Sequence, residues 1–493
     1  MTESIQAKTV RGSVILGGSS IVFRLINVVA SVYLLRLLDP VDFGIVALAS
    51  VVLSYTGLFA GLGLGSAVIQ APSDLKRTAY HSFVATAVMG ILLSGVIWAA
   101  AGSLASLLGN PNVTPVLQWM SAIVLLDSLS RIPESLLQKE LLFGRVSTGL
   151  IASELVYTGV ALLLAYLGFG LWSLVYANLL KLIVKLISYW MMCPGWDWVR
   201  PATWDWGLMK RLLRYGMHIT GTGFAYFFYS TIDNLLVGKL LGTSALGYYG
   251  KAYDFTNNTV GSLSNIISGV LFPSYSRIQE DKERLTNAYL KSLRLIAVVI
   301  IPIALGIFVT APEMITILIG DKWLPMILPL QILSLVYVFM SLSITIATVF
   351  QATGHPDLNF RGGAVVSIVI VPLILLFLGQ GIAGVACGVL VAHIIGFAYN
   401  VYRLNGILPG APAKMLMAVL PTVMTSLFML VGVQLSKEPL LHIVGGTHTV
   451  LSLLILVLIG IAIICLAMFV TQRPLVSELL AMVRVALKPK TEG

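Results

Sequence analysis

Long apolar runs constrain the fold of this chain more than any other feature. Between residues 12 and 70 two such runs are separated only by the short polar turn at 38–42. Each run is long enough to cross a bilayer, which takes about 20 helical residues. The pattern recurs to the end of the chain and predicts fourteen membrane spans, at residues 12–37, 42–70, 79–108, 114–137, 145–167, 170–192, 212–240, 244–273, 286–310, 325–352, 361–379, 381–404, 413–435 and 447–471.

Composition supports the same fold class. Of the 493 residues, 58% are hydrophobic and only 11% are charged, whereas a soluble domain has about 25% charged residues. We therefore predict an all-α polytopic membrane protein. The net charge of +10 comes from Lys and Arg near the span ends, so we expect no nucleic-acid partner. The three cysteines are far apart, which predicts neither a disulfide framework nor a metal site.

The basic residues predict the orientation. If the N-terminus is cytoplasmic, most of the 31 Lys and Arg residues lie on the inner side, as the positive-inside rule requires. The outer side keeps only Arg36, Lys239, Lys322 and Lys437. Both termini are then cytoplasmic.

The two halves of the chain resemble each other. Arg36-Leu37-Leu38 is followed by Gly44 at the same spacing that separates Lys239-Leu240-Leu241 from Gly247. Such a repeat predicts two pseudo-symmetric six-helix lobes facing a central cleft. The expected domains are the first lobe (1–192), a Trp-rich cytoplasmic linker (193–211), the second lobe (212–404), two added C-terminal helices (405–472) and a basic amphipathic cytoplasmic tail (473–493).

Arg24 lies in the middle of the first predicted span, with Asn27 one turn further on. An arginine at mid-bilayer costs at least about 2.5 kcal/mol, so it should face protein or water. It is either a structural ion pair between helices or a cation that lines the path of an anionic substrate.

The other ionisable residues of the first lobe allow a tally of charges. Asp127 and Arg131 are four apart and predict an ion pair on one helix. Glu154 is expected near the depth of Lys185 and could pair with it. After these pairings, Arg24 and Lys181 have no predicted acidic partner. Unpaired cations inside the membrane attract phosphate. The alternative is that an acid at another depth neutralises them.

In the second lobe, Lys251 and Asp254 are three apart on one helix, and Asp233 lies near the outer end of the preceding helix. They form either a local ion-pair cluster or part of the transport site. We include Lys251 among the candidate substrate-binding residues, together with Arg24, Asn27, Lys181 and Lys185. Asp233, Asp254 and Glu154 are candidates for binding a coupling ion, H⁺ or Na⁺.

Several motifs together resemble those of one family. They are Arg36–Ala47, Leu62–Gln70, Gly170–Val175, Leu246–Tyr249, Phe272–Gln279 and Gly320–Trp323. The chain resembles the Wzx-type lipid-linked oligosaccharide flippases, in the polysaccharide-transporter branch of the multidrug/oligosaccharidyl-lipid/polysaccharide exporter superfamily. The colanic acid exporter typifies the most similar branch. None of these motifs is catalytic.

The resemblance implies an alternating-access flippase in the bacterial inner (cytoplasmic) membrane. Its substrate would be an undecaprenyl-diphosphate-linked repeat unit for lipopolysaccharide or exopolysaccharide synthesis, carried from the inner to the outer leaflet. A cationic lumen between the lobes would receive the diphosphate, and Arg24 matches a cationic position of related flippases. A polysaccharide polymerase and a chain-length regulator are the implied partners, and no cofactor is implied beyond the coupling ion.

Two other functions are alternatives. An ion-coupled multidrug antiporter of the same superfamily would be expected to have twelve spans and an acidic lumen. A membrane glycosyltransferase could use Asp39 and Asp42 in the first outer turn, but that turn is too short to build an acceptor site. We interpret both residues as helix-capping groups and expect no enzymatic activity.

Overall fold

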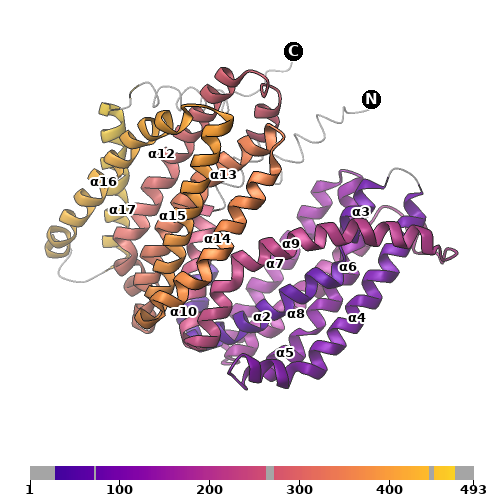
Figure 1. Cartoon of the computed structure of the whole chain (residues 1–493). Coiled ribbons are helices and arrows are strands. Elements are labelled where there is room, and N and C mark those ends of the chain that lie inside the picture. The colour runs from indigo at the N-terminus through magenta and orange to yellow at the C-terminus, as the bar shows by residue number, and fades with distance from the viewer. Residues whose placement is uncertain (1–27, 72–73, 262–270, 444–448, 472, 474–493) are drawn as a thin grey trace, which may run out of the picture. The chain divides into compact units, whose positions relative to one another are not determined.

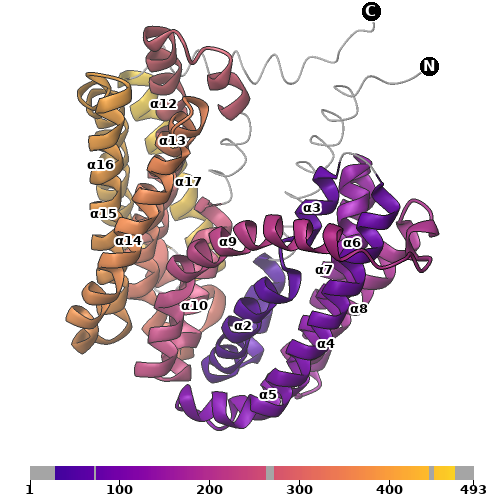
Figure 2. The same ribbon diagram turned by 45° about the vertical axis from the view of Figure 1, so that its right-hand side comes forward.

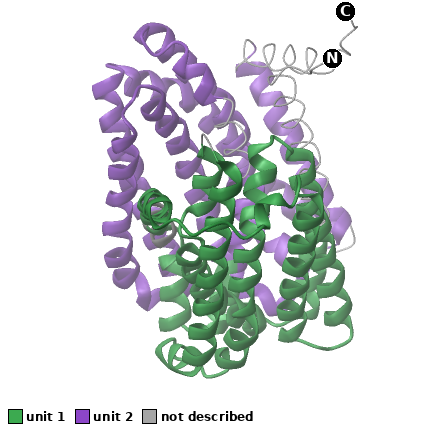
Figure 3. Cartoon of the chain, turned by 90° about the vertical axis from the view of Figure 1, so that its right-hand side faces the viewer, with its two compact units in different colours: residues 1–250 green, residues 251–493 purple. Residues whose placement is uncertain are grey.

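The computed structural model of the chain is all-helical in the residues it describes, which are 28–71, 74–261, 271–443, 449–471 and 473. The chain divides into two compact units, residues 1–250 and 251–493 (Figure 3). The first unit extends beyond the first predicted lobe to include α9 and the start of α10. The lobe boundaries predicted from the repeat stay a prediction.

The helices follow each other closely in the chain (Figure 1). Those that begin in unit 1 are α2 (Pro40–Gly61), α3 (Leu64–Gln70), α4 (Leu75–Leu107), α5 (Val113–Met120), α6 (Ala122–Lys139), α7 (Phe143–Tyr166), α8 (Leu171–Met192), η1 (Asp197–Val199), α9 (Trp206–Leu240) and α10 (Thr243–Thr256). Those of unit 2 are η2 (Asn257–Gly261), α12 (Lys282–Met314), η3 (Ile315–Ile319), η4 (Asp321–Met326), α13 (Ile327–Ala352), α14 (Pro356–Phe377), η5 (Leu378–Gln380), α15 (Gly381–Ile407), α16 (Ala411–Ile443) and α17 (Val450–Thr471).

Ten helical runs in the described residues are long and apolar enough to cross a membrane. One of them, Pro356–Ile407, contains both α14 and α15. The chain is therefore a multi-pass membrane protein, while the count of fourteen spans and the orientation stay predictions. Most of the first predicted span, 12–37, lies outside the described residues. The 35-residue α9 is not among the ten, because Gly, Thr and Tyr are frequent in its middle and lower its hydropathy.

The polar turn before α2 starts that helix. The backbone N–H of Asp39 donates to Asp42 Oδ2 at 3.2 Å, and Pro40 occupies the first helical position. Proline suits that position because its missing N–H has no partner there. The prediction that this turn caps a helix is confirmed.

The span predicted at 42–70 is wrong as a single helix. It is interrupted after Gly61, where Leu62 and Gly63 both have positive φ, 48° and 62°. The interruption lies against α9, which crosses α2 and α3 (Figure 2). A Cβ at Gly216 of α9 would be only 1.9 Å from the Leu62 carbonyl oxygen. The backbones of α9 and of the α2–α3 interruption therefore lie in direct contact. A prediction based on hydropathy cannot detect such a contact between distant segments, so it missed the interruption.

The Trp-rich linker is only partly a surface segment. Trp206 is 75% exposed, whereas Trp198 is 5% exposed and packs with Val68 and Ile132. The start of α9 is defined by Asp205, whose Oδ1 accepts the Leu208 N–H at 3.0 Å. That N–H holds the pKa of the Asp205 carboxyl below its usual value.

Unit 2 has its own core. Tyr289 of α12, Phe350 of α13 and Leu404 of α15 are fully buried and belong to one hydrophobic cluster. A second cluster joins α12 to the C-terminal pair α16 and α17 through Val309, Met429 and Leu456. The two added C-terminal helices thus pack on α12 of unit 2.

Candidate functional site

The polar side chains of α6 form one stripe. Asp127, Arg131, Glu134 and Gln138 follow at spacings of four, three and four residues, which places them on one helix face. Gln138 Nε2 donates to Glu134 Oε1 at 3.4 Å, and Arg131 forms an ion pair with Asp127. The stripe therefore contains two side-chain pairs, Asp127 with Arg131 and Glu134 with Gln138.

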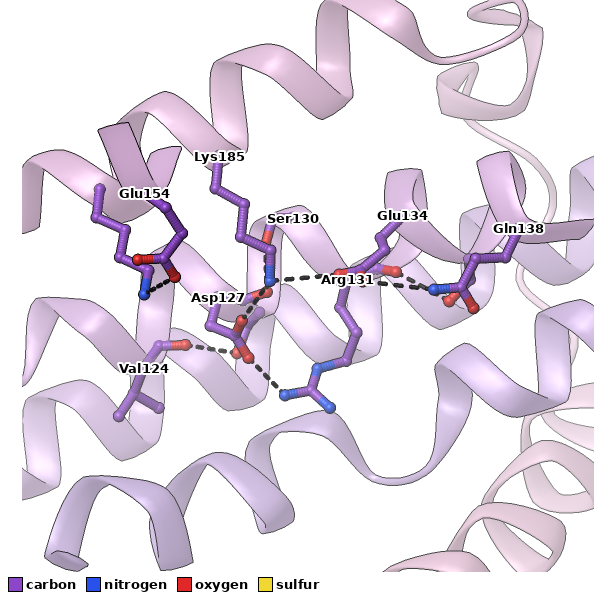
Figure 4. Close-up of polar contacts among 11 residues, drawn as sticks. Val124, Asp127, Ser130, Arg131, Glu134, Gln138, Glu154 and Lys185 are labelled. Atoms are coloured by element: carbon purple, nitrogen blue, oxygen red, sulfur yellow. Dashed lines mark hydrogen bonds and ion pairs between the residues drawn. The ribbon is translucent and has the colours of Figure 1, made fainter. Parts of the chain in front are cut away.

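Lys185 of α8 joins two members of this stripe (Figure 4). Its Nζ is 3.2 Å from Asp127 Oδ1 and 3.3 Å from Glu134 Oε2. The Lys185 side chain is only 15% exposed, so these two carboxylates largely replace its hydration. The same Nζ lies 5.6 Å from the centre of the Tyr189 ring, which adds a cation–π contact.

Lys181, one turn earlier on α8, forms an ion pair with Glu154 of α7. The exposed fractions of the two side chains are 28% and 31%. The Lys181 Nζ also lies 5.4 Å from the centre of the Tyr157 ring. Lys181 is thus the more accessible of the two α8 lysines.

Arg131 extends from α6 toward the interruption between α2 and α3. A Cβ at Gly61 would lie 2.6 Å from Arg131 Nη1, so the glycine leaves room for the guanidinium in this position. Within the described part of the chain, Arg131 Nε is buried and has no hydrogen-bond partner. An arginine at the end of α2 is favourable because the helix dipole is negative there.

The structure confirms one of the predicted ion pairs and changes the others. Asp127 and Arg131 pair as predicted. The predicted pair of Glu154 with Lys185 is wrong, and so is the prediction that Lys181 is unpaired, because Glu154 pairs with Lys181 instead. Depth alone suggested the first pairing, whereas the rotation of α7 and α8 about their axes decides which side chains meet.

Glu134 is the residue that sequence reasoning missed. It balances Lys185 together with Asp127. Its spacing of seven residues from Asp127 on a helical segment could have revealed it. With Glu134 included, there are three acidic and three basic side chains, which we call together the α6–α8 charge network. It consists of one connected group, Asp127, Arg131, Glu134 and Lys185, and one separate pair, Glu154 and Lys181.

The remaining candidates lie elsewhere. Arg24 and Asn27 are outside the described residues. Lys251 forms an ion pair with Asp254 at 2.9 Å, and the Asp254 side chain is 58% exposed. The ion-pair interpretation of these two residues is confirmed, while any part they take in substrate or ion binding stays a prediction.

Asp233 of α9 is buried, with 2% exposure. Its Oδ2 accepts the Tyr249 hydroxyl at 2.7 Å and its Oδ1 accepts the Asn234 N–H at 2.9 Å. Two neutral donors thus satisfy this carboxyl group. Among the described residues, no group of three His, Cys, Asp or Glu side chains could hold a metal ion.

Comparison with known proteins identifies the family. Residues 33–328, more than half of the chain, match the family described as polysaccharide biosynthesis protein. The succinoglycan biosynthesis transport protein ExoT of Rhizobium meliloti is 27% identical over 66% of this chain, a match that spans 65% of ExoT. The lipopolysaccharide biosynthesis protein WzxC of Escherichia coli is 24% identical over 80% of each chain.

Solved structures share the fold. The lipid II flippase MurJ in an inward closed conformation has a TM-score of 0.73 and 16% identity, over 94% of this chain and 100% of MurJ. An inward-facing multidrug transporter of the MATE family has a TM-score of 0.62 and 18% identity, over 78% of this chain and 95% of the transporter. The chain therefore belongs to the polysaccharide biosynthesis protein family.

Proposed function

We propose that this protein is a flippase that carries undecaprenyl-diphosphate-linked oligosaccharide units from the inner to the outer leaflet of the bacterial inner membrane. The observation that carries the proposal is the family match over residues 33–328. Relatives named for succinoglycan transport and lipopolysaccharide biosynthesis support a polysaccharide pathway. A protein of Haloferax volcanii with the name "Probable low-salt glycan biosynthesis flippase Agl15", 24% identical over 57% of this chain, supports flipping.

The α6–α8 charge network is the proposed place where the diphosphate binds. Its three cations are matched by three carboxylates, so the empty site is neutral. A diphosphate carries more charge than one carboxylate and can replace Glu154 at Lys181, where both side chains are about 30% exposed. Lys185 holds two carboxylates and is less exposed, so its role is to keep the network together. Lys181 then keeps an anionic partner throughout, and the displaced Glu154 carboxylate takes up a proton, because an unpaired charge inside the membrane is costly.

Arg24, Asn27 and Lys251 remain proposed contacts of the substrate. Arg24 adds a cation on the first span, and a guanidinium binds phosphate through two parallel hydrogen bonds. The movement that carries the bound headgroup across is alternating access, with a site open to one side of the membrane at a time. A polysaccharide polymerase and a chain-length regulator are the proposed partners, because they use such repeat units outside the membrane.

The coupling ion is proposed to be H⁺ at Asp233. Its carboxyl group is buried against Tyr249 and Asn234 and has no ion-pair partner among the described residues. A carboxylate in this setting gains or loses a proton more readily than it binds Na⁺, which needs several oxygen ligands. Asp254 and Glu154 are weaker candidates because each is held by a lysine.

An ion-coupled multidrug antiporter is the second candidate function. The similarity of fold to the MATE transporter supports it, and so does the balanced charge of the α6–α8 network. The two functions differ in their cargo. A flippase variant without activity leaves a lipid-linked glycan in the inner leaflet, whereas an antiporter variant without activity changes drug sensitivity and leaves lipid-linked glycans unchanged.

The decisive experiment deletes the gene and extracts the lipid-linked glycans. We expect a lipid diphosphate that carries one complete repeat unit to accumulate, and expression of the wild-type chain to remove it. Mass spectrometry of the lipid identifies the sugars. Loss of drug resistance without any accumulated lipid-linked glycan would contradict the flippase proposal.

A further inference from the structure

A cavity of about 340 Å³ lies in unit 2, where the loop before α14 meets the C-terminal end of α15. It is distant in sequence from the α6–α8 network, and no predicted site residue lines it. Four of its seven lining residues have polar or aromatic side chains. The lining residues are His355, Leu358, Tyr402, Arg403, Asn405, Gly406 and Ile407.

The wall offers hydrogen-bond donors. Arg403 Nε is buried and has no hydrogen-bond partner among the described residues, which is costly for a charged group unless a ligand or water completes it. Asn405 uses its Oδ1 to accept the Gly410 N–H at 3.0 Å, so its amino group remains to donate. Tyr402 is 73% exposed at the rim. Such a set of donors fits a ligand with several acceptor oxygens.

The charge of the wall selects an anion. Of the described residues that line the cavity, none is acidic, and Arg403 carries a full positive charge. Asp357, the nearest acid along the chain, pairs with Arg361 at 3.3 Å, and neither lines the cavity. The N-terminal end of α14 begins at Pro356 beside His355, and its dipole adds partial positive charge.

The outer surface of the same helices is apolar. Ile368 and Leu376 of α14 are 72% and 73% exposed, and Ile394 of α15 is 39% exposed. In a multi-pass membrane protein these side chains face lipid. An anion held at the end of such a pair can therefore be the headgroup of a lipid whose acyl chains lie along α14 and α15. Basic pockets of this kind between spans bind anionic lipid headgroups.

We propose that this cavity binds the phosphate ester of an anionic membrane phospholipid, with Arg403 and Asn405 as its donors. None of the residues proposed to bind the transported substrate lines this cavity, and Arg403 lies on the side that the charge distribution predicts to be cytoplasmic. Its ligand is therefore a lipid of the inner leaflet. Free phosphate shares the same chemistry, and the experiment separates the two sources.

The test is native mass spectrometry of the full chain in detergent, titrated with phosphatidylglycerol. Arg403→Gln should weaken lipid binding about tenfold, the loss expected for one charge-assisted hydrogen bond. Arg361→Gln is the matched control, because Arg361 is 58% exposed, pairs with Asp357 and does not line the cavity. Equal effects of the two variants, or no effect of Arg403→Gln, would overturn the proposal.

A second variant guards against misfolding. Asn405→Asp keeps an oxygen that accepts the Gly410 N–H while placing a negative charge in the cavity. It should lose phosphatidylglycerol and keep the melting temperature of the wild type. Millimolar inorganic phosphate should compete only weakly. If phosphate alone binds in an Arg403-dependent way and displaces the lipid, the lipid assignment is wrong.

Discussion

Gly44 of α2 and Gly247 of α10 occupy corresponding positions in the sequence repeat and lie backbone to backbone. A Cβ at Gly44 would be 1.7 Å from the Thr243 carbonyl oxygen and 3.1 Å from Gly247 N. A Cβ at Gly247 would be 1.9 Å from the Pro40 carbonyl oxygen. Each glycine therefore makes room for the start of the other's helix. Asn110, in the loop between α4 and α5, donates a hydrogen bond from its Nδ2 to Thr243 Oγ1 at 3.2 Å, which links this loop to the start of α10.

Gly247→Ala should destabilise unit 1 at this crossing. The added methyl group cannot fit unless α2 and α10 separate, and overpacking of this kind costs about 1–3 kcal/mol. We expect a lower melting temperature of the detergent-solubilised protein. Gly250→Ala, one turn further on, is the control, because its methyl group would meet only Asn234 Oδ1 at 4.0 Å. Equal melting temperatures for the two variants would contradict the packing argument.

Variants that neutralise Lys181, Glu154 or both show whether Lys181 binds the substrate or only stabilises the fold. Glu154→Gln should preserve glycan export because Lys181 stays available, whereas Lys181→Gln should reduce it about tenfold. The double variant has no charge imbalance and should be stable, yet it should export as poorly as Lys181→Gln. Export is measured as surface polysaccharide at matched expression. Recovery of export in the double variant would show that the pair is only structural.

Lys185→Met should destabilise the α6–α8 network. Removing Lys185 leaves Glu134, which is 25% exposed, without the cation that it contacts, and leaves Asp127, which is 30% exposed, with Arg131 alone. After allowance for partial hydration, we expect a cost of about 1–3 kcal/mol, measured as a lower melting temperature. Lys76→Met is the control, because its partner Asp197 is 57% exposed and the pair lies at the surface. An unchanged melting temperature of Lys185→Met would mean that water already stabilises both carboxylates.

Asp233→Asn tests proton coupling. Asn keeps an oxygen for the Tyr249 hydroxyl but cannot release a proton. If protonation of Asp233 drives transport, export by this variant should lose its dependence on external pH. Asp254→Asn changes an exposed carboxylate paired with Lys251 and should keep that dependence. A wild-type pH profile in Asp233→Asn would exclude Asp233 as the coupling site.

Asp205 should make the stability of the α9 start depend on pH. The Leu208 N–H lowers the pKa of its carboxyl group in the folded state. A lowered pKa means that the stabilisation is present above the unfolded pKa of about 4 and is lost as the pH falls through the folded value. The melting temperature of the wild type relative to Asp205→Asn should therefore fall below about pH 4. A constant difference from pH 3 to 7 would contradict this.

Interactions between residues that are close in the chain could be predicted from the sequence. The capping turn at Asp39 and Asp42 and the ion pair between Asp127 and Arg131 both lie within one helical turn. Interactions between neighbours in the chain depend on helix geometry that is the same in every protein. Apolar runs long enough to span a bilayer likewise indicated a multi-pass membrane protein without any tertiary information.

Contacts between helices could not be predicted in the same way. The sequence by itself determined that this is a multi-pass helical membrane protein and which charged residues its helices carry. Only the tertiary structure decided that Lys181 meets Glu154 and that Lys185 meets Asp127 and Glu134, because small rotations of α7 and α8 exchange these partners. It also decided where α2 ends, since the close approach of Gly216 to Leu62 depends on how α9 crosses it.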